Sequence, residues 1–121
     1  AAANGIRIIP VEEFHARGVA DVMAEARDIV GSEPCYVSYD IDFVDPTFAP
    51  GTGTPVSGGL STAQALTIVR GLLPLNIVGM DIVEVAPAYD HAEITALAGA
   101  TLALDLLCLF ARAPWRRSTS P

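Results

Sequence analysis

The sequence has 121 residues, the usual length of one domain, and 51% of them are hydrophobic against 17% that are charged. Its net charge of −7 excludes sequence-independent binding of nucleic acid, which needs clustered Lys and Arg. No secretory signal is recognisable, and the longest apolar stretch, residues 94–113, contains polar and charged residues that indicate a buried helix and no membrane span. Cys35 and Cys108 form no metal-type pair and are expected to be core thiols, which favours a reducing compartment and a cytoplasmic protein.

The first forty or so residues predict a strand, a helix and a second strand. Residues 5–10 (GIRIIP) are a β-branched run that ends at a proline, which is typical of a strand. Residues 12–13 are expected to lie in a short helical turn, and residues 19–30 carry apolar side chains at helical spacing up to Gly31. Residues 35–42 (CYVSYDID) predict a buried strand that ends in acidic residues.

A long loop follows this strand. Residues 43–59 hold three prolines and four glycines, a composition that excludes regular helix. A loop of this length in a compact domain is either functional or disordered, and its apolar content favours an ordered, functional loop. Ser61 and Gln64 then form the pattern of a capping box, which predicts a helix that ends near Leu72.

The last predicted elements are a strand and a long helix. Residues 77–85 (IVGMDIVEV) form a second continuously hydrophobic run that ends in acid. Asp90 is expected to cap a helix that extends to about residue 111, with Glu93 at the capping-box position. The polar, basic residues 114–121 predict a flexible tail.

The alternation of strands and helices predicts the α/β class, as a three-layer αβα arrangement around a parallel sheet. The two later strands are hydrophobic throughout, as expected where helices cover both faces of the sheet. Three strands alone leave an exposed edge, so the sheet is expected to continue with residues upstream of Ala1. Residues 1–113 are therefore interpreted as part of a single domain.

Three acidic residues follow the ends of the two buried strands. Ligands of open α/β sheets gather at the carboxyl ends of the strands, so Asp40, Asp42 and Glu84 are expected to converge there. Residues two apart in a strand point to the same face, which would pair the carboxylates of Asp40 and Asp42. Paired carboxylates favour a hard divalent cation such as manganese, magnesium or calcium. The alternative is that the two aspartates only cap the following loop by accepting backbone N–H bonds.

Longer motifs carry a resemblance to a known family. Residues 38–46 (SYDIDFVDP), followed by residues 49–55 (APGTGTP), closely resemble a signature of the ureohydrolase family, which comprises arginases, agmatinases and their relatives. Residues 79–87 (GMDIVEVAP) resemble a second stretch of that family, and residues 89–93 (YDHAE) look most like agmatinases and guanidinobutyrases. The resemblance covers residues 37–109 and implies the C-terminal half of one ureohydrolase α/β domain.

The resemblance implies a role for each matching residue. Asp40 and Asp42 match metal-binding aspartates, which in such enzymes hold a pair of Mn²⁺ ions together with His and Asp residues from earlier strands. Glu84 matches the carboxylate that binds the substrate guanidinium, and Thr54 matches a loop position that lines the site. Asp42 is also a candidate for moving a proton to the leaving nitrogen, so Asp42 and Glu84 are the expected catalytic residues.

Three further positions match the family with less defined roles. Asp45 is interpreted as a residue that organises the loop, and Asp81 as a neighbour of the metal ligands. His91, at the start of the last helix, is interpreted as structural or as part of the pocket rim.

The activity that the resemblance implies is hydrolysis of a guanidino compound by a hydroxide activated by two manganese ions, most simply of agmatine to putrescine and urea. The alternatives are a guanidinobutyrase or related amidinohydrolase, and a non-catalytic fragment that keeps a residual metal site. The family's other His and Asp ligand motifs are absent from these 121 residues, so the chain alone is expected to be inactive. A homo-oligomer, trimer or hexamer, is expected for the full-length protein, with no nucleic-acid or membrane partner.

Overall fold

The computed structural model describes residues 4–112, so the predicted flexible tail at 114–121 lies outside the described residues. Helices and strands follow one another in this order: α1 (Val11–Arg17), α2 (Val19–Val30), β1 (Pro34–Asp40), the 3-10 turn η2 (Ile41–Phe43), α3 (Thr62–Gly71), β2 (Asn76–Val83), the 3-10 turn η3 (Pro87–Tyr89) and α4 (Ile94–Arg112). The order agrees with the α/β class predicted from the sequence.

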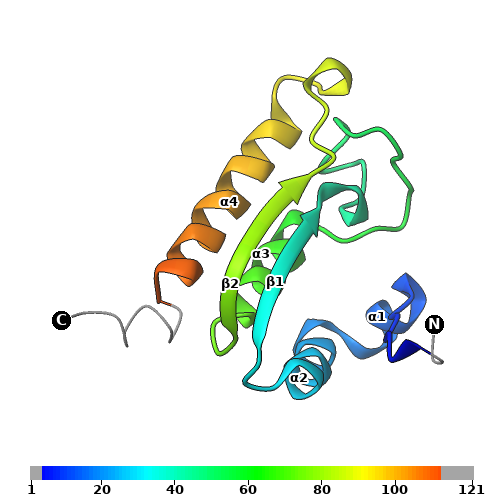
Figure 1. Ribbon diagram of the computed structural model, residues 1–121. Helices are drawn as coiled ribbons and strands as arrows, with labels where there is room; N and C mark the ends of the chain where they lie inside the picture. The colour runs from blue at the N-terminus through cyan, green and yellow to red at the C-terminus, as the bar shows by residue number, and fades with distance from the viewer. Residues whose placement is uncertain (1–3, 113–121) are drawn as a thin grey trace.

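The two strands form a parallel pair, as predicted (Figure 1). Inward-facing Tyr39 of β1 packs in one core cluster with Val69 of α3 and Leu102 of α4, so both helices cover the same face of the sheet. On the opposite face Tyr36 is 60% exposed and Val78 is 46% exposed. In the described part of the chain, helices therefore cover one face of the sheet and leave the other open, so these residues hold only part of the predicted three-layer αβα arrangement.

The helix α3 begins as the sequence predicted. The Ser61 hydroxyl accepts the backbone N–H of Gln64 at 3.2 Å, and the Gln64 side chain accepts the backbone N–H of Ser61 at 2.9 Å. This reciprocal capping box satisfies two backbone donors that the first helical turn leaves free. The α3 helix is thereby fixed directly after the long loop.

The predicted strand at residues 5–10 is wrong. Gly5 lies in a turn and residues 6–10 have no regular secondary structure, because a strand needs a neighbouring ladder and β1 pairs only with β2 among the described residues. Side chains attach this segment to the helices instead: the Arg7 guanidinium forms ion pairs with Glu13 of α1 and Glu25 of α2. Arg17 bonds the same two glutamates, so one ionic network joins the segment to both helices.

The helix α4 begins later than predicted and is buried on one stripe only. Glu93 lies in a left-handed conformation (φ 61°), so it precedes the helix and cannot complete a capping box. By length and composition alone α4 could cross a membrane. In the structure its Leu102 lies in the hydrophobic core, whereas Leu104 on the outward side of the helix is 61% exposed. Both cysteines are free, and Cys108 on this helix is exposed, so the prediction of a core thiol fails for it.

The packing of α4 yields a first test. Leu102→Ala is expected to lower the free energy of unfolding by about 2–5 kcal/mol, because the side chain is 1% exposed and its removal leaves a cavity. Leu104→Ala on the same helix is the control, since exposed substitutions change stability by no more than about 0.5 kcal/mol. Urea denaturation of the complete natural protein measures both, and equal losses would contradict the packing described.

Candidate active site

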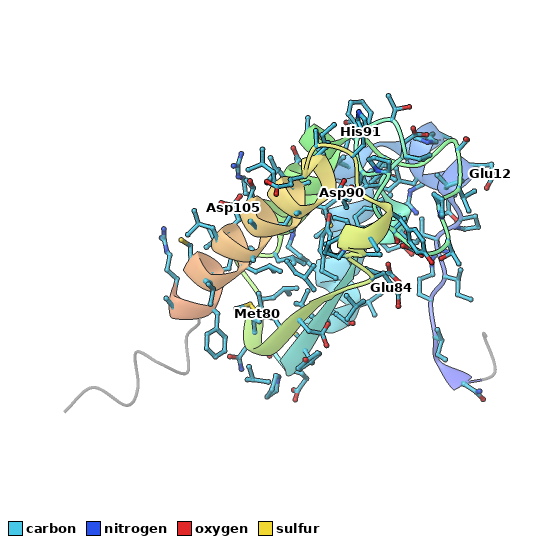
Figure 2. All side chains as sticks on the ribbon, turned by 90° about the horizontal axis from the view of Figure 1, so that it is seen from above. Glu12, Met80, Glu84, Asp90, His91 and Asp105 are labelled. Atoms are coloured by element: carbon cyan, nitrogen blue, oxygen red, sulfur yellow. The ribbon has the colours of Figure 1, made fainter. Side chains whose placement is uncertain are left out.

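The carboxyl ends of the two strands bring Asp40 and Glu84 to one edge of the sheet. Asp40 is the last residue of β1 and pairs with Val83, the last residue of β2, so Glu84 follows directly beside it (Figure 2). Asp42 lies two residues beyond Asp40, at the same edge. The predicted convergence of the three acids at this edge is therefore observed.

The predicted pairing of Asp40 and Asp42 on one strand face is wrong. β1 ends at Asp40, and Asp42 lies in η2, where the chain has already turned. The turn forms because Asp40 Oδ1 accepts the backbone N–H of Asp42 at 2.9 Å. One oxygen of Asp40 thus performs the capping role that was the alternative to metal binding, and its other oxygen has no such bond among the described residues.

The two carboxylate oxygens of Asp42 differ in their surroundings. Its Oδ2 accepts the hydroxyl hydrogen of Thr54, which brings this loop residue to the strand ends. Its Oδ1 is buried and has no hydrogen-bond partner among the described residues. A buried carboxylate oxygen without a donor is costly, and a hard divalent cation is the kind of ligand that satisfies it.

The acids at this edge can supply only part of a metal site. Among residues 4–112 no group of three or more His, Cys, Asp or Glu side chains is placed to hold an ion. Asp40 and Asp42 offer hard oxygen ligands of the type that Mn²⁺ accepts. The donor chemistry fits manganese, provided that further ligands come from elsewhere.

Glu84 occupies a strained turn that faces the loop. Its φ of 65° lies in the left-handed region, which is unfavourable for a residue with a side chain and is often found at functional sites. A Cβ added to Gly53 would lie 3.8 Å from Glu84 Oε2, so the carboxylate is close to the loop backbone next to Thr54. The loop therefore bonds Asp42 through Thr54 and passes close to Glu84 at Gly53.

Asp45 holds the two ends of the loop together. Its Oδ1 accepts the backbone N–H of Thr47 at 2.8 Å and its Oδ2 accepts that of Gly58 at 2.7 Å. The Thr47 side chain and these backbone donors lower the pKa of Asp45. His15 of α1 bonds the Gly58 carbonyl at 2.9 Å from outside the loop. The interpretation of Asp45 as a loop organiser is confirmed.

A second attachment of the loop, at Gly51, was not found from the sequence. The Gly51 N–H donates to the Thr95 hydroxyl at 2.7 Å, and the Gly51 carbonyl accepts the Ala86 N–H at 2.8 Å. Thr95 is fully buried in the first turn of α4. Because Thr95 is 44 positions from Gly51, no local pattern could have indicated this contact.

Asp90 fixes the start of α4 beside this attachment (Figure 2). Its Oδ1 accepts the backbone N–H groups of His91 (2.9 Å) and Thr95 (3.0 Å), and its Oδ2 accepts that of Ala96 (2.9 Å). Desolvation raises the pKa of Asp90, but the bonds from Ala96, Thr95 and His91 outweigh it and lower the pKa from 3.8 to about 2. His91 contributes its backbone here, in agreement with a structural role.

Acid should therefore weaken the start of α4. Since the folded pKa of Asp90 is lower than its ordinary value, its stabilisation is complete above pH 3.8 and is lost as the pH falls through about 2. The stability difference between the natural protein and Asp90→Asn is expected to shrink across this range. Thermal melts from pH 5 to pH 2 measure it, and a difference independent of pH would contradict the capping role.

Asp81 lies on the open face of the sheet. Its Oδ2 accepts the Tyr36 hydroxyl hydrogen at 2.9 Å, and its Oδ1 is buried without a partner among the described residues. Asp81 pairs with Ser38, two residues before Asp40, so it lies two residues before the carboxyl end of its strand. This position is compatible with its interpretation as a neighbour of the metal ligands.

A cavity of about 450 Å³ opens on one side of this edge. Its walls are mainly apolar side chains of α1, α2 and residues 56–60, and Asp42 is the charged residue among those that line it. Neither Glu84 nor Thr54 lines it. The cavity therefore meets the candidate site only at Asp42 and is not identified with a substrate pocket.

Comparison with known proteins decides the family. The family model described as the arginase family matches residues 1–108. The chain belongs to the arginase family. This membership confirms the resemblance found in the sequence motifs.

The proteins of this family that are similar to the chain carry different enzyme names. The agmatinase of Proteus mirabilis is 59% identical over 106 residues, which cover 88% of this chain and 35% of the relative. The crystal structure of a hypothetical agmatinase from Burkholderia thailandensis has a TM-score of 0.86 at 52% identity, over 96% of this chain and 36% of that one. Proclavaminate amidino hydrolase from Streptomyces clavuligerus has a TM-score of 0.89 at 44% identity, over 93% and 37%. The chain thus spans about a third of the length of its relatives, and it has their fold.

Proposed function

We propose that the complete natural protein is a metal-dependent ureohydrolase that hydrolyses agmatine to putrescine and urea. The relatives named agmatinase, at 59% identity, support the substrate. The observation that carries the chemistry is the position of three acids at one sheet edge, where the loop bonds Asp42 and passes close to Glu84. Asp40 and Asp42 suit a cation, and Glu84 suits a guanidinium group.

Asp40 and Asp42 would hold manganese through hard oxygen ligands, together with ligands from outside the described residues. When bound, a pair of Mn²⁺ ions supplies a hydroxide nucleophile near neutral pH. The Oδ1 of Asp42 is buried without a hydrogen-bond partner among the described residues, and a bound cation would satisfy it. Thr54 fixes the orientation of Asp42 by donating its hydroxyl hydrogen to Oδ2.

Glu84 would bind the guanidinium of the substrate. A planar guanidinium presents parallel N–H donors that match both oxygens of one carboxylate, which fixes the position of the central carbon. Hydrolysis adds a water oxygen to this carbon and breaks its bond to the nitrogen of the alkyl chain. Asp42, at the same edge, would pass the proton from that oxygen to the leaving nitrogen, which departs as the amine while the carbon leaves as urea.

One observation favours a second substrate class. The chain is also 44% identical to a protein named proclavaminate amidino hydrolase, with a TM-score of 0.89. A bulkier amidino compound or 4-guanidinobutanoate is therefore the alternative substrate, because the described residues would bind the guanidinium end and not the rest of the molecule.

Urea release from a panel of guanidino compounds tests the proposal. With Mn²⁺ the complete protein is expected to release urea fastest from agmatine, more slowly from 4-guanidinobutanoate and arginine, and hardly at all after removal of the metal by a chelator. If another guanidino compound gave the highest kcat/KM, that compound would replace agmatine as the proposed substrate, and the proposed reaction class would stand. No urea from any of them would overturn the proposal.

The 121-residue chain assayed alone is proposed to be inactive, because two aspartates bind a cation weakly without further ligands. The complete protein is proposed to be a trimer or hexamer, as family members typically are. Sedimentation of the protein used in the urea assay would report its oligomeric state.

A further inference from the structure

We infer that Thr95 is a positioning residue, which holds the loop at the distance from Glu84 that the reaction needs. The inference rests on the proposed function and deepens it. Thr95 lies in α4 and contacts neither a proposed metal ligand nor the proposed guanidinium-binding residue. It acts through Gly51 of the loop.

Gly51 is the point at which the loop is joined to the rest of the site. Its N–H donates to the Thr95 hydroxyl at 2.7 Å, and its carbonyl accepts the N–H of Ala86, two residues after Glu84, at 2.8 Å. Three residues further along, Thr54 bonds Asp42. The Gly51 peptide therefore links the turn that carries Glu84 to the segment that orients Asp42.

The geometry around Gly51 leaves little freedom. Gly51 is buried, and a Cβ at this position would lie 2.6 Å from Asp90 Cβ, so the loop backbone packs directly on the residue that caps α4. Thr95 is 0% exposed, and its backbone N–H is held by Asp90 Oδ1 at 3.0 Å. A hydroxyl on a fully buried side chain, whose own backbone is bonded by Asp90, can fix the position of the backbone that donates to it.

The Thr95 hydroxyl is the side-chain acceptor for a buried backbone N–H. If it is removed, the Gly51 N–H loses its partner, and a buried amide without an acceptor favours any movement that reaches water. Such movement would shift Thr54 and Asp42 relative to Glu84. Because Glu84 still binds the guanidinium, KM should change little, while kcat should fall as the two halves of the site lose their alignment.

Thr95→Val tests this in the complete protein, because valine keeps the shape and removes the hydroxyl. Turnover of agmatine, corrected for the folded fraction, is expected to fall about 10- to 100-fold in kcat with KM within about threefold. Thr95→Ser keeps the hydroxyl and should restore most of kcat. Thr101→Val is the matched control, since the Thr101 hydroxyl bonds only the Leu97 carbonyl within α4 at 2.8 Å.

A second measurement does not depend on activity. Amide hydrogen exchange of residues 48–56 is expected to be faster in Thr95→Val than in the natural protein or in Thr101→Val. If the natural protein is active, two results would overturn the positioning role alone. One is unchanged amide exchange in Thr95→Val, and the other is a kcat of Thr95→Val equal to that of Thr101→Val. A natural protein that releases no urea from any guanidino compound would overturn the proposed function, and the positioning role with it.

Discussion

Asp42→Asn is expected to lower kcat/KM for agmatine by about 10²–10⁴-fold, the usual cost of removing a group that transfers a proton in the reaction. The substitution removes one negative charge from a carboxylate whose Oδ1 is buried and has no hydrogen-bond partner within residues 4–112. It should also weaken binding of Mn²⁺, because a neutral amide is a poorer ligand for a hard cation. Steady-state urea release and titration calorimetry with Mn²⁺ measure the two effects.

Asp28→Asn is the control for Asp42→Asn. Asp28 is an exposed residue of α2, so the same loss of charge there should leave turnover and Mn²⁺ affinity unchanged. If Asp42→Asn had the same activity and the same Mn²⁺ affinity as the natural protein, both proposed roles of Asp42 would be wrong. Weakened metal binding with full activity at saturating Mn²⁺ would remove the proton-transfer role only.

Glu84→Gly is expected to produce a protein that is more stable and inactive. Glycine adopts a φ of 65° without the cost of about 1 kcal/mol that a side chain incurs in the left-handed region, so the free energy of unfolding should rise by about that amount. Loss of the carboxylate removes two charged hydrogen bonds to the guanidinium, each worth about 1.5–3 kcal/mol, so a fall of roughly 10²–10⁴-fold in kcat/KM is expected.

Glu93→Gly is the matched control, because Glu93 has the same side chain and a φ of 61°. This variant should gain a similar stability and keep full turnover of agmatine. Chemical denaturation and urea release on both variants separate the contribution of the backbone from that of the carboxylate. Glu84→Gly that is active, or is less stable than Glu93→Gly by several kcal/mol, would contradict the account of this turn.

Elements specified by local patterns were predictable from the sequence. The capping box of Ser61 and Gln64 needs only residues three apart, and the hydrophobic runs of β1 and β2 indicated a parallel pair. The position of Asp40 and Glu84 at one sheet edge then followed from the strand ends alone. These features required no knowledge of distant contacts.

Features that depend on distant partners were missed. Residues 5–10 have strand composition, but no neighbouring strand completes a ladder with them in the described part of the chain. The turn at Asp42 is a local feature, in which the Asp40 side chain accepts the Asp42 N–H; the sequence offered this capping role as an alternative, but a strand pattern continues through both residues. The bond between Gly51 and Thr95 joins residues 44 apart, so it could be found only in three dimensions.

The acids at this sheet edge are proposed to bind both metal and substrate. Anomalous diffraction at the manganese edge, from crystals of the complete protein soaked with Mn²⁺ and agmatine, would locate both ligands. We expect manganese peaks within coordinating distance of Asp40 and Asp42, and the agmatine guanidinium on the carboxylate of Glu84. Manganese bound away from both aspartates, or a guanidinium held without Glu84, would contradict the account.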